Sequence, residues 1–429
     1  MHWGPSANIF SRQHPLTPFW TLDCKFLPPP FLLFFSRVAI HSMMRSVTVL
    51  SALVAAVSAA TTCSEEIRIT EPTPVINCDV VDANVIVDER VDGSLSIEGP
   101  KQLRKDFIVS NATKLISISS SSINAVGGSL RLENLQLLSS CNLQALTSVV
   151  DMMLLNLPQL NGLTLGTEGV TKARRISIAD TFISDLTGLN IASAESIDIS
   201  NNPKLTTFDS PLVNVTKSLK LVNNGNNMQV NMSSLQTCGE IQFRQVKNFD
   251  APILSRAESI KFNDSPELLS VSCSNLTEIA ASLTLINNKK LNRLSFPMLK
   301  TIKGDMTIQN NTALQQIDGF PKVESVGNIL LRGNFRNVTL DQLRDVKGSA
   351  TATSTTDISA FCDFFSDLKK KGNIRGKESC TSNNKNANEE GGTGGQSNSD
   401  KEKDAAGIVG VNSALLSVAL VATLAHMVL

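Results

Sequence analysis

The stretch LTLINNKKLNRLSFPMLKTIKGD (residues 283–305) is followed directly by MTIQNNTALQQIDGFPKVESVGN (residues 306–328). The two segments align without a gap. Each begins with two apolar residues at alternate positions, continues with two asparagines, and has further apolar residues in register, such as Leu291 with Leu314. A repeat of this length predicts an architecture in which every unit contributes one structural element of the same kind.

The same pattern recurs along most of the chain. Copies begin 19 to 23 residues apart, at Leu130, Met153, Ile176, Ile197, Leu219, Ile241, Ile260, Leu283, Met306 and Ile329. Apolar residues at alternate positions are typical of a β-strand with one buried face. A single strand cannot bury that face, but a second strand stacked about 4.8 Å away pairs the backbone and extends the core. The sequence therefore predicts an all-β fold, a parallel β-solenoid of leucine-rich-like repeats over residues 60–380.

The asparagine after each strand suits a corner with a left-handed backbone, and its amide is placed to bond to the neighbouring turn. The rest of each unit shows no helical period, because its apolar residues come in short bursts broken by Pro or Gly, as in Phe296-Pro297. This favours all-β coils over a horseshoe backed by helices. A β-sandwich with coincidental spacing is the other alternative.

Both ends of a solenoid expose core residues and need caps. Residues 359–371 carry apolar residues at helical spacing, which predicts a short C-terminal cap helix; these are Phe361, Phe364, Phe365 and Leu368.

Four cysteines flank the repeats and predict two cap-stapling disulfides in an oxidising compartment, Cys63 with Cys78 and Cys362 with Cys380. Cys141, Cys238 and Cys273 remain. Cys141 and Cys273 lie six repeats apart, roughly 29 Å at one strand spacing per repeat, and this exceeds the reach of a disulfide. A Cys238–Cys273 bond stays open, and Cys141 is interpreted as a buried thiol.

Aromatic and imidazole side chains are scarce. The chain has no Tyr, its two Trp are Trp3 and Trp20, and its four His are His2, His14, His41 and His426. The repeat region thus lacks the imidazole that Ser-His-Asp sites, Cys-His sites and His-ligated zinc require. The lack of imidazole does not exclude hydrolases that use a pair of carboxylates. However, the sequence shows no alternating carboxylate motif and no Gly-rich phosphate loop. We therefore predict no catalytic, metal or cofactor site.

The charge balance bears on possible partners. The 39 basic residues equal the 39 acidic residues, so the basic excess of a nucleic-acid binder is absent.

Residues 44–59 have the parts of a secretory signal peptide: a basic start at Arg45, the apolar run 47–57 and small residues up to Ala59, after which we place the cut. The run is too short to span a bilayer, which takes roughly 20 apolar residues; a buried core helix is the alternative. We interpret residues 1–43 as an upstream extension of the gene model, although a late signal sequence is also possible.

The C-terminal residues resemble a GPI-attachment signal, with small residues at 391–399, a charged spacer at 400–404 and an apolar tail at 405–429 that would be removed. Residues 381–404 form a polar linker. Within it Ser397 is the preferred attachment site, with Asn398 and Gly395 as alternatives. A tail-anchored transmembrane helix is the competing interpretation. The expected partner of the anchored C-terminal end is the plasma membrane.

These features together resemble the fungal extracellular-mutant/sporulation-specific family of GPI-anchored cell-wall organisation proteins. The resemblance covers about residues 61–380 and is most specific in 311–320, 326–327, 333–335 and the cysteines at 362 and 380. It implies a right-handed, receptor L-domain-like solenoid, a role in cell-wall integrity without catalytic activity, and wall glycans or wall proteins as partners. The short linker departs from the long Ser/Thr-rich stalk common in the family, which favours retention at the plasma membrane.

Seven sequons occur in the repeat region, about as many as chance provides. We expect glycosylation at five of them: Asn111, Asn214, Asn231, Asn275 and Asn337. Asn263 and Asn310 are less favoured, because they fall on the expected corner ladder.

Three functions remain open. The favoured one is a non-enzymatic, GPI-anchored organiser of the cell wall. The second is a receptor-like module that binds a protein or glycan through outward strand residues, namely Lys220, Gln242, Lys261 and Thr307. The third is a wall-modifying carbohydrate enzyme.

Overall fold

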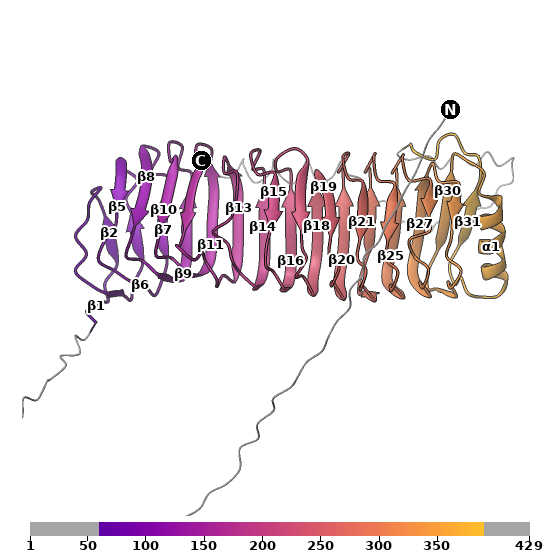
Figure 1. Cartoon of the computed structure of the whole chain (residues 1–429), viewed down its shortest axis with the longest axis horizontal. Coiled ribbons are helices and arrows are strands. Elements are labelled where there is room, and N and C mark those ends of the chain that lie inside the picture. The colour runs from indigo at the N-terminus through magenta and orange to yellow at the C-terminus, as the bar shows by residue number, and fades with distance from the viewer. Residues whose placement is uncertain (1–59, 390–429) are drawn as a thin grey trace, which may run out of the picture. The chain divides into compact units, whose positions relative to one another are not determined.

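The computed structural model describes residues 60–389. These residues form a parallel β-solenoid of about 13 turns that ends in one short helix, as Figure 1 shows. This confirms the predicted fold class and its cap helix. The predicted extension, the signal peptide with its cut after Ala59, the attachment region around Ser397 and the tail lie outside the described residues. No helix within residues 60–389 is long and apolar enough to cross a membrane.

The main sheet contains 20 strands. They are β1 (Thr62–Cys63), β2 (Ile67–Ile69), β3 (Val80–Val81), β4 (Val85–Val87), β6 (Gln102–Leu103), β7 (Phe107–Ser110), β9 (Ala125–Glu133), β11 (Ser148–Leu157), β13 (Arg175–Thr181), β14 (Ser193–Ser200), β16 (Asn214–Val222), β18 (Thr237–Arg244), β20 (Arg256–Asn263), β22 (Glu278–Ile279), β23 (Leu283–Ile286), β25 (Thr301–Gln309), β27 (Ser325–Gly333), β29 (Asp345–Val346), β30 (Ala350–Ser354) and β31 (Glu378–Thr381).

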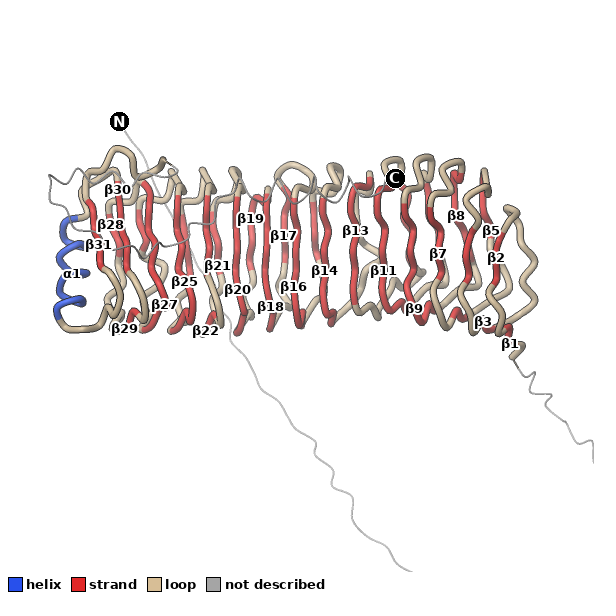
Figure 2. Tube along the Cα trace, turned by 180° about the vertical axis from the view of Figure 1, so that it is seen from behind, coloured by secondary structure: helices blue, strands red, loops and turns tan. Residues whose placement is uncertain are grey.

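Three smaller sheets of four, five and two strands complete the turns. The first contains β5 (Gly93–Ser96), β8 (Leu115–Ser120), β10 (Ser140–Leu143) and β12 (Gly162–Leu165). The second contains β15 (Thr207–Asp209), β17 (Met228–Asn231), β19 (Val246–Asp250), β21 (Ser270–Ser272) and β24 (Arg293–Ser295). The third pairs β26 (Gln316–Ile317) with β28 (Asn337–Val338). Figure 2 shows strands of successive turns lying side by side along the whole stack.

Each main strand pairs in parallel with the equivalent strand of the next turn, so that apolar residues of equal position stack in columns. Leu283 faces Met306, and Leu285 faces Ile308. These four side chains are at most 2% exposed. Burial of one such column after another gives the continuous core that the repeat predicted.

One predicted repeat start is wrong by one residue. The residue that pairs with Leu130 and Ile176 is Met152, whereas Met153 pairs with Arg131 on the outward face. Met152 is fully buried. Because side chains alternate between the two faces of a strand, a shift of one residue exchanges core and surface. The run of apolar residues at 152–155 hides the alternation.

The corner after each main strand uses two residues where the sequence predicted one. A first column has left-handed φ values of 49° to 62°, and it contains Asn111, Asn134, Asn156, Asp180, Asn201, Asn223, Gln245, Asp264, Asn287 and Asn310. Within it side-chain amides bond between turns, as from Asn134 Nδ2 to Asn111 Oδ1 at 3.0 Å.

The next residue is buried in each of these turns, and where it is polar it forms a second column that bonds to the backbone; the polar members are Thr181, Asn202, Asn224, Ser265, Asn288 and Asn311. Asn288 Oδ1 accepts the Ser265 N–H at 3.0 Å, and Asn311 Oδ1 accepts the Asn288 N–H at 2.9 Å. The first column therefore supplies the left-handed conformation, while the second satisfies the backbone of the neighbouring turn.

The C-terminal end is closed by α1 (Ser359–Lys370), whose buried residues are Phe361, Phe365 and Leu368. A disulfide joins Cys362 in this helix to Cys380, with Cα atoms 5.4 Å apart.

At the other end of the stack Cys63 is bonded to Cys78, with Cα atoms 5.9 Å apart. Both disulfides thus lie at the first and last turns, where a solenoid needs a cap.

Residues 382–389 then fold back along earlier turns. The Asn384 N–H donates to the Ser354 carbonyl at 2.8 Å, and the Arg332 guanidinium donates to the Glu389 carbonyl at 3.2 Å. The start of the linker therefore lies against the solenoid.

Candidate interaction face

The outward face of the main sheet carries a straight row of side chains. Lys220 pairs with Gln242, and Gln242 pairs with Lys261. Thr284 follows Lys261 in the next turn, and Thr307 follows Thr284. The four residues singled out from the sequence therefore belong to one row, with members about 4.8 Å apart. All five side chains are half-buried by their neighbours on the same face.

Parallel rows flank this one on both sides. One flank contains Arg244, Asn263 and Ile286. The other contains Glu240 and Ser259. The face is thus about three side chains wide and mostly polar, and its width is set by strand length.

Charges on the face are paired between turns. Lys261 Nζ lies 2.7 Å from Glu240 Oε1, and Lys303 Nζ lies 2.8 Å from Glu278 Oε1. Such partly exposed pairs each stabilise a fold by about 1 kcal/mol or less. Their main consequence is that part of the charge on this face is neutralised.

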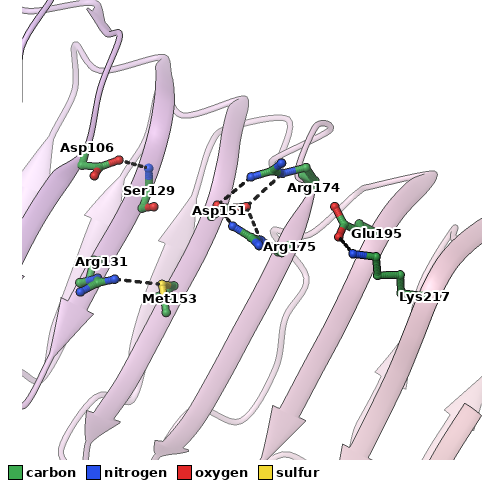
Figure 3. Close-up of polar contacts among 9 residues, drawn as sticks. All are labelled: Asp106, Ser129, Arg131, Asp151, Met153, Arg174, Arg175, Glu195 and Lys217. Carbon is green, nitrogen blue, oxygen red and sulfur yellow. Dashed lines mark hydrogen bonds and ion pairs between the residues drawn. The ribbon is translucent and has the colours of Figure 1, made fainter. Parts of the chain in front are cut away.

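One cluster departs from one-to-one pairing. Figure 3 shows Arg174 and Arg175 converging on Asp151, with Arg174 Nη2 3.1 Å from Asp151 Oδ2 and Arg175 Nε 3.0 Å from Oδ1. The Asp151 side chain is 10% exposed, whereas each arginine is 52% exposed. The hydrogen bond from Arg175 is the largest cause that holds the pKa of Asp151 below its usual range, and Arg174 adds to it. Two guanidinium groups against one carboxylate leave an excess positive charge.

The next turn continues this cluster with an ion pair of Glu195 and Lys217, which lowers the pKa of Glu195. The Asp151 cluster was not predicted from the sequence. Its signal was present: Asp151 lies 24 residues before Arg175, which is about one repeat. Opposite charges one repeat apart meet on a solenoid face.

The carboxyl groups with a clear pKa shift share one direction. Within residues 60–389, every carboxyl group with a clear shift has a lowered pKa; these are Asp79, Asp88, Asp151, Glu195, Glu278 and Asp357. A carboxylic acid that donates a proton near neutral pH needs a raised pKa. The same residues contain no group of three potential metal ligands among His, Cys, Asp and Glu.

Cys141, Cys238 and Cys273 are free and buried. Burial raises the pKa of Cys141 and of Cys238 to about 12, and it also raises that of Cys273. The open question of a Cys238–Cys273 bond is thereby answered, since neither is paired. Thiols of this kind are poor nucleophiles at neutral pH.

The predicted sequons differ in exposure. Four asparagines are exposed, namely Asn111, Asn231, Asn275 and Asn337, and Asn214 is half-buried. The expectation for Asn263 was wrong in one respect: Asn263 ends β20, and the corner position of that turn belongs to Asp264. Asn310 does occupy a corner, with φ 56°. The expectation was wrong for Asn111, which also occupies a corner, with φ 60°, and accepts a hydrogen bond from Asn134. Occupancy of all seven sequons stays a prediction.

No family model and no solved structure matches the chain. A "Cell surface GPI-anchored protein" of Arthroderma benhamiae is 28% identical over 306 residues, which cover 71% of this chain and 78% of that protein. "Protein ecm33" of Aspergillus fumigatus is 26% identical over 324 residues, 75% of this chain and 80% of the relative. "Sporulation-specific protein 2" of Saccharomyces cerevisiae is 29% identical over 334 residues, 76% of this chain and 66% of the relative. The chain is similar to proteins of the fungal Ecm33 family.

This similarity confirms the resemblance seen in the sequence. The relatives are named as cell-surface GPI-anchored proteins and as a cell-wall mannoprotein, in agreement with the predicted location on the outer face of the plasma membrane or in the cell wall. The two disulfides agree with this location, because they persist in an oxidising environment.

Proposed function

We propose that this chain, which is similar to Ecm33-family proteins, is a non-enzymatic glycoprotein that supports the organisation and integrity of the fungal cell wall. In this proposal Ser397 carries the GPI anchor, and the outward face of the main sheet meets wall glycans or wall proteins. The observation that supports it best is the in-register row from Lys220 to Thr307, which offers a regular polar surface over five turns.

The absence of catalysis is part of the same proposal. The clear carboxyl pKa shifts of residues 60–389 are all downward, mostly because Arg or Lys side chains of the chain donate hydrogen bonds to these groups, whereas a general acid near neutral pH needs a raised pKa.

A knockout challenged with wall-perturbing agents tests the proposed role. Full-length protein should restore growth, whereas a version without residues 405–429 should be secreted and fail to restore it. Full rescue by the secreted form would overturn the anchored-organiser role.

A second set of variants tests the face itself. Lys220→Ala with Lys261→Ala should reduce rescue while leaving protein level and surface localisation unchanged. Lys290→Ala is a matched control, because Lys290 also forms an ion pair, with Glu267 at 2.6 Å, but lies at the corner. Equal rescue by the face variant and the control would contradict the assignment of the face.

The same row supports a second candidate, a receptor-like module that binds one protein or glycan ligand. The two functions differ in what the purified protein does. A receptor-like module should bind one class of ligand saturably and lose that binding in the Lys220→Ala, Lys261→Ala variant, whereas a general organiser should bind bulk wall material without a single saturable site.

A further inference from the structure

A cavity of about 350 Å³ lies between the last solenoid turns and α1. It exists because the smaller sheet ends there. β28 pairs with β26 on one side, and at the same place in the next turn the chain forms α1, which does not continue the strand ladder. A space therefore remains between β28 and α1.

The walls of this cavity combine an aromatic ring with carboxyl groups. Phe364 of α1 lines it and is half-buried, although Phe361 and Phe365 on the same helix are buried. Asp341 and Asp357 also line it. An aromatic ring and carboxylates around one space match a pyranose sugar, which has an apolar C–H face and hydroxyl groups at its edge.

Asn337 also lines the cavity, and it begins the sequon Asn337-Val338-Thr339. The Asn337 side chain is exposed, and its Nδ2 atom has Thr339 Oγ1 of the same sequon at 3.4 Å. Two other sequon asparagines, Asn214 and Asn310, line cavities, but those cavities have no aromatic side chain in their walls.

We propose that the first N-acetylglucosamine on Asn337 occupies this cavity, packs against Phe364 and holds α1 onto the last turns. Attachment forms a bond between Nδ2 and C1 of the sugar. The C1–O bond to the lipid pyrophosphate donor breaks, the pyrophosphate leaves with the electron pair, and one Nδ2 proton goes to a base of the transferase. The inference rests on the proposed glycosylation of the chain.

Two measurements on the full-length glycoprotein from a fungal host test the proposal. Peptide mass spectrometry reports whether Asn337 carries sugar, and hydrogen exchange reports the protection of residues 359–370. Asn337→Gln and Thr339→Ala each remove the sequon, and each should speed exchange of α1 about three- to tenfold. Asn231→Gln is the matched control, because it removes another exposed sequon, outside this cavity, and should leave α1 exchange unchanged.

Enzymatic trimming to a single N-acetylglucosamine separates the first sugar from the rest of the glycan. The trimmed protein should keep full protection of α1. The proposal is overturned if Asn337 carries no sugar, if both sequon variants exchange like the wild type, or if trimming speeds exchange as much as the variants do. If Asn337 carries sugar and the sugar protects α1, the inference is supported whatever the wall-stress assay shows. Failure of the proposed cell-wall function is therefore distinguishable from failure of this inference.

Discussion

Replacing Asn288 by alanine tests whether the buried corner column holds adjacent turns together. Asn288 is fully buried. Its Oδ1 accepts the Ser265 N–H at 3.0 Å, and its Nδ2 donates to the Phe262 carbonyl at 2.9 Å. Alanine removes both bonds and leaves the Ser265 N–H buried without a partner, whereas Phe262 stays paired with the next strand in the parallel ladder.

The unsatisfied donor costs about 1–3 kcal/mol and the lost bond to the Phe262 carbonyl about 0.5–1.5 kcal/mol, so the free energy of unfolding should fall by about 1.5–4.5 kcal/mol. A solenoid's stability is approximately a sum over turns and their interfaces. The loss should therefore be concentrated in the turns that contain residues 265 and 288, with distant turns much less affected.

Urea unfolding followed by circular dichroism measures the total loss, and hydrogen exchange of the Ser265 amide locates it. Asn292→Ala is the matched control: Asn292 belongs to the same turn, but its side chain is exposed and makes no hydrogen bond to the described residues. Its effect should stay within about 0.5 kcal/mol. If Asn288→Ala and Asn292→Ala unfold at the same urea concentration, or if the Ser265 amide keeps its protection, the reasoning is refuted.

Three further changes have defined outcomes. Gly239→Ala places a Cβ 2.0 Å from a backbone carbonyl oxygen of the preceding turn, so stability in urea should fall by about 1–3 kcal/mol. Gly162→Ala, whose nearest contact is 3.4 Å away, should be tolerated, and equal losses would contradict the argument. The pKa of Asp88 is lowered from 3.8 to about 2, chiefly by an arginine hydrogen bond, so its stabilising effect is complete above pH 4 and disappears as the pH falls toward 2. Thermal unfolding between pH 4 and 2 should therefore depend less on pH in Asp88→Asn than in the wild type. Replacing Cys362 and Cys380 by Ser opens a bridge between residues 18 apart and should cost about 3 kcal/mol, and unchanged hydrogen exchange in α1 would count against a capping role.

The repeat made most of the fold predictable from the sequence. Apolar pairs at alternate positions defined the strands, and the asparagines marked the corners, because each feature recurs at nearly constant spacing. The prediction failed at Met153, where four apolar residues in a row gave no alternation to follow. The prediction was incomplete at the corners. A motif of two asparagines does not reveal which one has the left-handed backbone conformation and which one forms hydrogen bonds to the backbone of the neighbouring turn.

The candidate interaction face was predictable wherever the strand register could be predicted from the repeat. Lys220, Gln242, Lys261 and Thr307 could be assigned to one row because equal steps along the repeat bring equal positions together. The Asp151 cluster was missed because its turn is longer than most. The return of residues 382–389 was also missed, since this polar segment carries no periodic pattern and is held by hydrogen bonds to earlier turns.

The corner columns hold adjacent turns together without help from the outward side chains of the main sheet. The spacing between turns is set by backbone pairing and by buried residues such as Asn288 and Asn311, and the outward side chains contribute little to it. Lys220 can therefore be changed without loss of packing, and surface substitutions of this kind stay within about 0.5 kcal/mol. A Lys220→Ala, Lys261→Ala protein that is folded and correctly located would then report on recognition alone. If that protein instead unfolds at markedly lower urea, the face is part of the fold's stability, and a defect in wall rescue would no longer identify it as a binding surface.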